Sequence, residues 1–250
     1  MRARLGMITP SSNSALEPMT CEMLAGMRGV SAHFSRFRVT EIALDAPALG
    51  QFDPTYMLPA AELLADAKAQ AIAWNGTSAS WLGIDRDEAL CAAITAKTGA
   101  PATTSTLACL DALRCAGAQR IGLVTPYTQD VQRRIGDVWR AAGAPCLAER
   151  HLGIRDNFTF AEVAPDTIAD MIRGVAQEGC DAVVILCTNM NGARVAADLE
   201  RELGVLVLDS IAVTLWRTLK IAGIDGRALA PWGRIFRDTE FQEPEDRGKT

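Results

Sequence analysis

Histidine is scarce in this chain, and the cysteines form no pattern typical of a metal site. Two histidines, His33 and His151, are present, which gives little support to a His-rich metal site or a Ser-His-Asp triad. The seven cysteines are odd in number, scattered and without a CxxC pair, which indicates reduced thiols rather than a disulfide framework or a zinc site. We therefore expect no bound metal.

An excess of basic residues and long apolar runs are also missing. The formal net charge is −5 and Lys and Arg are scattered, which argues against a nucleic-acid surface. No apolar run approaches the ~20 residues that a membrane helix needs, and the chain enters a predicted strand without a visible signal peptide. With 49% hydrophobic and 22% charged residues, the composition indicates an ordinary globular protein, expected in the cytoplasm. Its oligomeric state is left open, a homo-oligomer included.

Two stretches far apart in the chain share one pattern, in which an apolar run ends in a small residue, then Thr, then a small polar residue. They cover residues 71–79 and 182–192, and their alignment places Cys187 opposite Gly76. Residues 5–13 and 121–129 form a second similar pair with nearly the same displacement. The period suits one domain of about 100–150 residues, so we interpret the pairs as an internal duplication.

Apolar runs alternate with amphipathic segments, which predicts parallel strands covered by helices. Residues 33–40 alternate in polarity and are expected nearer a sheet edge, whereas residues 41–57, with Pro47, Gly50 and Pro54, are expected to form an irregular connection. The expected strands are residues 3–9, 33–40, 71–75, 120–125, 146–151, 181–186 and 205–208. The expected helices are residues 14–27, 59–70, 86–98, 105–116, 129–142, 165–178, 192–203 and 210–222.

These elements predict an α/β fold of two Rossmann-like lobes with parallel sheets, related by the internal duplication. The first lobe is expected over residues 1–107, completed by 212–236, the second over 108–211, and a flexible tail over 237–250. In open α/β sheets, ligands bind at loops beyond the carboxyl ends of the strands. The active site is therefore expected in the cleft between the lobes.

Cys187 is the strongest candidate for a catalytic residue, because it ends a buried strand and opens a polar loop. The alternative is that it is a small buried hydrophobe, as most cysteines are. That interpretation is adopted for the other cysteines, which lie in helical or strand-entry segments: Cys21, Cys91, Cys109, Cys115, Cys146 and Cys180. His33 and His151 are assigned to strands or their edges.

Further polar residues follow the predicted strand ends. Their hydroxyls, amides and adjacent helix N–H groups suit a carboxylate or an enediolate oxygen. Ser11, Ser12 and Asn13 also suit the cap of the following helix, and both roles can hold at once. The candidates are Asn13, Thr77, Ser78, Tyr127, Thr188 and Asn189.

Several motifs carry a resemblance to a known family. One group comprises Gly76-Thr77-Ser78-Ala79-Ser80-Trp81, Pro101-Ala-Thr-Thr-Ser105, Tyr127 and Gly233-Arg-Ile-Phe236. A second group comprises Pro10-Ser-Ser-Asn13-Ser-Ala-Leu-Glu17 and the Asp156-Asn157 loop. From Gly6 to about Phe236, the chain resembles the aspartate/glutamate racemase superfamily. The first group is similar to arylmalonate decarboxylases, and the second to maleate cis-trans isomerases.

The resemblance implies roles for individual residues. Members usually carry two cysteines, one from each lobe, that flank the substrate α-carbon. Gly76 replaces the first, as in the decarboxylase, and Cys187 matches the second. The resemblance further implies that a carboxylate is held by Asn13, Tyr127 and Asn157, and that Thr77 and Ser78 donate to an oxyanion. Thr188-Asn189 stand where the decarboxylase has a Gly pair. Because of this departure, the resemblance does not extend to the decarboxylase's large apolar pocket for an aryl group.

Residues and resemblance together predict a cofactor-independent enzyme that acts at the α-carbon of a small carboxylic or dicarboxylic acid. A single thiol facing Gly76 allows one-sided proton delivery to an enediolate, which suits decarboxylation. With a pKa of about 8.5 such a thiol is mostly protonated at neutral pH. A second thiol at residue 76 is expected to add racemase character. The alternatives are maleate cis-trans isomerase activity, which usually needs the missing first cysteine as nucleophile, then a racemase, or a non-catalytic dicarboxylate-binding protein.

Overall fold

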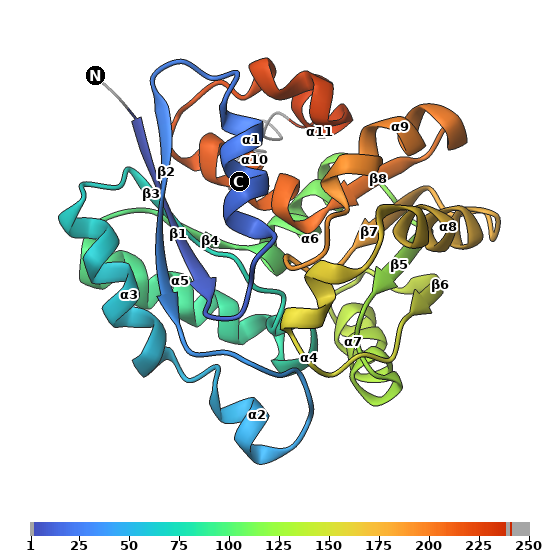
Figure 1. Ribbon diagram of the computed structural model, residues 1–250, viewed down its shortest axis with the longest axis horizontal. Coiled ribbons are helices and arrows are strands. Elements are labelled where there is room, and N and C mark those ends of the chain that lie inside the picture. Colours follow the sequence, from blue (N-terminus) through green and yellow to red (C-terminus); the bar gives the residue numbers. More distant parts are fainter. Residues whose placement is uncertain (1–2, 239–240, 242–250) are drawn as a thin grey trace, which may run out of the picture.

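Two four-stranded parallel sheets form the framework of the molecule (Figure 1). The computed structural model describes residues 3–238 and 241. The first sheet has the strand order β2-β1-β3-β4 and the second has β6-β5-β7-β8. The strands are β1 (Ala3–Pro10), β2 (Val30–Phe37), β3 (Ala71–Trp74), β4 (Ala102–Thr104), β5 (Ile121–Thr125), β6 (Cys146–His151), β7 (Ala182–Ile185) and β8 (Leu206–Asp209).

The two sheets repeat one topology and one register, which confirms the predicted α/β class and supports the internal duplication. Ile8 of β1 pairs with Trp74 of β3, and Val124 of β5 pairs with Ile185 of β7. These two pairs stand at equivalent places of the aligned stretches. Every residue of β3 and β7 is buried, as expected for continuous apolar runs in strands covered on both faces.

The helices and 3-10 helices connect these strands. The helices are α1 (Leu16–Leu24), α2 (Ala46–Gly50), α3 (Pro54–Asp66), α4 (Ala79–Leu82), α5 (Ile84–Thr98), α6 (Ser105–Cys115), α7 (Gln129–Ala141), α8 (Pro165–Ala176), α9 (Ala193–Leu203), α10 (Ser210–Ile221) and α11 (Arg234–Arg237). The 3-10 helices are η1 (Phe158–Glu162) and η2 (Arg227–Trp232).

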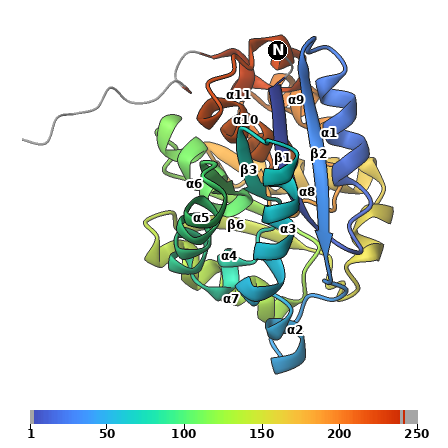
Figure 2. The same ribbon diagram turned by 90° about the vertical axis from the view of Figure 1, so that its left-hand side faces the viewer.

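Helices cover both faces of the first sheet. α3 and α5 lie on its outer face, in front of the strands in Figure 2, and α1 and α10 lie on the face turned toward the second sheet. α10 follows the last strand of the second sheet, yet it packs on β3, β4 and α6. This return of the chain supports the proposed assignment of residues 212–236 to the first lobe.

Three local expectations are wrong. Residues 102–104, which are absent from the expected strands, form β4 beside β3. The segment 41–57, expected to be irregular, contains α2 and the start of α3. α3 begins at Pro54 rather than Pro59, because Asp53 caps it by accepting a hydrogen bond from the Thr55 N–H at 2.8 Å. The assignment of the second strand to a sheet edge is confirmed, because β2 lies at the end of its sheet.

The tail expected over residues 237–250 falls mostly outside the described residues. Within it, Arg237 ends α11. Phe241 is buried, and its ring centroid lies 6.2 Å from that of Trp216. Among residues 3–238, no helix is long and apolar enough to cross a membrane.

Candidate active site

The carboxyl ends of four central strands bring loops from both lobes together. In the first sheet, β1 and β3 lead into residues 11–15 and 75–78; in the second, β5 and β7 lead into 126–128 and 186–192. Hydrogen bonds join these loops across the lobes, and the side chains that form them are buried. The predicted residues therefore meet at one place between the two sheets.

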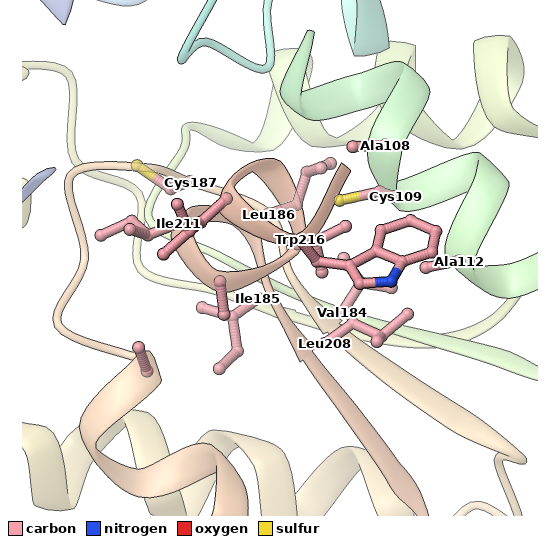
Figure 3. Packing of buried hydrophobic residues seen from close by; sticks show 14 of the residues in the cluster. Ala108, Cys109, Ala112, Val184, Ile185, Leu186, Cys187, Leu208, Ile211 and Trp216 are labelled. Carbon is pink, nitrogen blue, oxygen red and sulfur yellow. The ribbon is translucent and has the colours of Figure 1, made fainter. Parts of the chain in front are cut away.

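Cys187 follows β7 and is 3% exposed. Figure 3 shows its side chain at the margin of the hydrophobic cluster, pointing away from Cys109 and Trp216. Its Sγ accepts a hydrogen bond from the Asn189 N–H at 3.4 Å and one from the Tyr127 hydroxyl. Burial raises the pKa of the Cys187 thiol to about 12, against the opposing effect of these two donors. The thiol is protonated at neutral pH, as expected, but its pKa lies well above the expected value of about 8.5.

Tyr127 connects this thiol to the first lobe. Its hydroxyl shares a hydrogen bond of 2.7 Å with Thr77 Oγ1 and also contacts the Cys187 sulfur. Edge-on contacts with Trp81 and Phe160, at centroid distances of 5.2 and 5.6 Å, hold the Tyr127 ring. Burial raises the pKa of Tyr127 well above its usual range, so the phenol is neutral and can donate a hydrogen bond.

Asn13 and Thr188 form a second connection between the lobes. The Asn13 amide donates to the Thr188 carbonyl oxygen at 3.0 Å and to Thr188 Oγ1 at 3.2 Å. The Thr188 hydroxyl donates to the Asn75 carbonyl at 2.9 Å. Thr77 and Thr188 are equivalent residues of the duplicated loops, and each hydrogen-bonds to the opposite lobe. These reciprocal contacts hold the two aligned loops together.

Asn189 and Asn157 lie where the second lobe meets the start of α1. Asn189 Oδ1 accepts hydrogen bonds from the N–H groups of Ser14 at 2.9 Å and Ala15 at 3.1 Å, and its amide donates to the Asn157 carbonyl. The Asn157 amide donates to Ser12 Oγ at 2.7 Å. Helix N-terminal N–H groups suit a carboxylate. A carboxylate that binds at this helix start must therefore replace the Asn189 oxygen.

The helix-capping interpretation is correct for Asn13 and wrong for the two serines. Asn13 Oδ1 accepts hydrogen bonds from two N–H groups at the start of α1, at 2.9 and 3.1 Å. Ser11 and Ser12 instead donate to the carbonyl of Val39. Because Asn13 caps through its oxygen, its amide N–H groups remain directed to the other lobe, and the two expected roles are compatible.

Gly76 and Ser78 lie against the indole of Trp74. The Trp74 Nε1–H donates to Ser78 Oγ at 3.4 Å. A Cβ placed on Gly76 would lie 2.1 Å from Trp74 Cζ2, far inside van der Waals contact. Sequence reasoning missed Trp74. The one signal that could have found it is the repeat alignment, which sets this large indole opposite Ile185.

A segment from each lobe pairs with one from the other beside the site, and sequence reasoning missed this pairing as well. The Ile42 N–H donates to the Arg155 carbonyl at 3.0 Å, and the Asn157 N–H donates to the Thr40 carbonyl at 3.1 Å. The Arg155 guanidinium also forms an ion pair of 3.0 Å with Glu41. The polar loop after β6 and the connection after β2 thus join the two lobes.

The remaining cysteines and histidines lie away from these contacts. All seven cysteines are free; Cys109 and Cys180 are buried, but Cys21 is exposed, which contradicts its assignment as a buried hydrophobe. His33 lies in β2 and His151 in β6, where its Nδ1 is 2.9 Å from Glu149, so their assignment to strands is confirmed. Within residues 3–238, no group of three or more His, Cys, Asp or Glu side chains could hold a metal ion.

Fold and site together define a two-lobed α/β enzyme with one buried cysteine between paired strand-end loops. The chain belongs to the arylmalonate decarboxylase family, whose model matches residues 5–236. It is 30% identical over 174 residues to arylmalonate decarboxylase of Bordetella bronchiseptica, which covers 68% of this chain and 72% of the relative. It is 27% identical over 230 residues to maleate isomerase of Geobacillus stearothermophilus, covering 87% and 90%.

The comparison of folds agrees with the family. The crystal structure of maleate isomerase Iso from Pseudomonas putida S16 superposes with a TM-score of 0.87 at 23% identity, and the match covers 94% of this chain and 98% of that one. The resemblance to the aspartate/glutamate racemase superfamily is thus confirmed, and so is the expectation of a decarboxylase or isomerase.

Proposed function

We propose that this protein decarboxylates a small malonate-type diacid through an enediolate, with Cys187 as the proton donor. The observation that carries the proposal is the pairing of a buried, protonated thiol with a glycine in the equivalent loop of the other lobe. Such a site has a proton donor on one face only. Family membership favours this enzyme over a non-catalytic dicarboxylate-binding protein.

In the proposed reaction, the bond between the α-carbon and one carboxyl group breaks, and that carboxyl group leaves as CO₂. The electron pair stays on the α-carbon and is delocalised into the remaining carboxylate as an enediolate. Hydroxyl donors at Thr77 and Ser78 stabilise its oxygens; loss of one such donor typically costs about 2.7–4 kcal/mol of transition-state energy. The proton of the Cys187 thiol then moves to the α-carbon.

The surroundings of Cys187 suit both protonation states that this step requires. The raised pKa keeps the proton on sulfur until a strongly basic carbanion forms. The resulting thiolate has two donors in place, the Asn189 N–H at 3.4 Å and the Tyr127 hydroxyl. A proton from water restores the thiol after product release.

Binding of the diacid requires rearrangement of the contacts between the lobes. The amides of Asn13 and Asn157 donate to neutral protein oxygens of Thr188 and Ser12. Hydrogen bonds to an ionised carboxylate are roughly twice as strong as those to neutral acceptors. A dicarboxylate can therefore displace these oxygens, with one of its two carboxylates held by Asn13, Tyr127 and Asn157.

Maleate cis-trans isomerisation is the second candidate, favoured by the 27% identity to a maleate isomerase over 87% of this chain. Gly76 removes the first-lobe cysteine that the isomerase mechanism normally needs, so this route would have to be rebuilt around Cys187. A two-base racemase ranks third, because it requires thiols on both faces. We place the enzyme in the cytoplasm, because all seven of its cysteines are free.

NMR in D₂O tests the proposal with malonates, maleate and amino or hydroxy diacids, without added metal or nucleotide. The expected result is loss of CO₂ from a malonate with one deuterium at the α-carbon of a single product enantiomer. Conversion of maleate to fumarate without CO₂ loss would establish the isomerase instead. Absence of turnover of every diacid would refute both candidates.

A further inference from the structure

The indole of Trp74 occupies the space that a side chain at residue 76 would need. Trp74 ends β3, and Gly76 follows it by two residues in the loop beyond the strand. A Cβ built on Gly76 would lie 2.1 Å from Cζ2, 2.4 Å from Cε2 and 2.8 Å from Cη2 of Trp74. Three clashing ring atoms show that the indole lies flat over this glycine.

The indole is held in this place from two sides. Its ring centroid lies 5.0 Å from that of Phe37, with the ring planes at 52°. Its Nε1–H donates to Ser78 Oγ at 3.4 Å. The Trp74 side chain is fully buried, so its displacement would have to open a closely packed core.

We propose that Trp74 is a specificity-determining residue whose indole keeps the first-lobe face of the site free of a second thiol. This inference rests on the proposed function, in which one-sided protonation follows from a single thiol. Gly76 and Trp74 then act as a pair: the glycine makes room for the indole, and the indole excludes any replacement for the glycine. Contrary to the expectation from sequence, a cysteine at residue 76 is not sufficient to create a two-thiol site.

A cycle of stability measurements tests the steric pairing without any substrate. Gly76→Ala is made in the natural chain and together with Trp74→Leu, and Gly26→Ala is the control because a Cβ there meets no atom within 4 Å. In the natural chain, Gly76→Ala should lower Tm by about 5 °C or more. In the Trp74→Leu background the same change should cost less than half as much. Equal losses in both backgrounds would overturn the proposal.

Isotope exchange tests the consequence for specificity. Gly76→Cys alone should keep a single product enantiomer. The double variant Trp74→Leu/Gly76→Cys should exchange the α-proton of the product with D₂O at least tenfold faster than either single variant. If Gly76→Cys and the double variant show the same increase in the rate of α-proton exchange, the proposed role of Trp74 is overturned. If wild type and all variants lack turnover, the proposed function fails, and the stability cycle still decides whether the indole is the barrier.

Discussion

Replacement of Cys187 by alanine tests the central assignment. The change removes the proposed proton donor and leaves the Asn189 N–H and the Tyr127 hydroxyl without their shared acceptor. Loss of a general acid typically lowers the rate 10²–10⁴-fold, or about 3–5 kcal/mol in transition-state energy. Most of the ligand affinity should remain, because the carboxylate-binding amides are untouched.

The effect on folding has to be separated from the effect on chemistry. A buried donor left without a partner costs about 1–3 kcal/mol, and 1 kcal/mol lowers Tm by about 2–4 °C in a chain of this size. Cys187→Ser returns an acceptor to these donors but is a much weaker acid than a thiol. It should therefore recover stability and not rate.

Cys109→Ala is the matched control, because Cys109 is also fully buried and burial likewise raises the pKa of its thiol to about 12. It lies in α6, away from the hydrogen bonds between the lobes. The assay is CO₂ release and α-deuteration at saturating substrate, with Tm recorded for each variant. If Cys187→Ala keeps more than about a tenth of the wild-type rate, a loss below 1.4 kcal/mol, the assignment is wrong.

Three further results are expected. Tyr127→Phe and Asn157→Ala should each lose about 1.5–3 kcal/mol of substrate binding, seen mainly as a higher KM; an unchanged KM in both would contradict the carboxylate-binding role. The rate should stay level from pH 7 to about 10, because the donor must be protonated and burial raises the pKa of Cys187 to about 12; a decline near pH 8.5 would disprove this. Burial also raises the pKa of Asp209 to about 7 from 3.8, so the folded state keeps this proton longer than the unfolded state. Stability from this group is therefore lost as pH rises from about 4 to 7. In urea unfolding, the free energy of unfolding of Asp209→Asn should rise relative to that of the wild type over this pH range, by up to about 4 kcal/mol.

Local sequence patterns were sufficient to predict the framework. The alignment of residues 71–79 with 182–192 matches the sheet register, in which Ile8 pairs with Trp74 and Val124 with Ile185. A strand buried on both faces of a parallel sheet has a continuous apolar sequence, whichever strands lie beside it. β4 was missed because three residues, Ala102–Thr104, are too short to show a period.

The contacts inside the site depend on tertiary geometry and could not be predicted in this way. Asn189 Oδ1 caps α1 of the opposite lobe, a partner 174 residues away in sequence from Ala15. The rotamer that lays Trp74 over Gly76 depends on packing against Phe37. The raised pKa of Cys187 follows from its burial in the folded protein. In each case the sequence supplies the residue and the fold supplies its environment.

The reciprocal threonine contacts explain why a duplicated fold can hold an asymmetric site. Thr77 bonds to Tyr127 at 2.7 Å and Thr188 to the Asn75 carbonyl at 2.9 Å, so the equivalent loops are anchored by equivalent residues. The residue just before each threonine is free to differ, because neither hydrogen bond passes through its side chain. One copy therefore carries the Cys187 thiol and the other a glycine beneath an indole. In the proposed reaction, the two faces of the substrate then meet different chemistry without loss of the contacts that join the lobes.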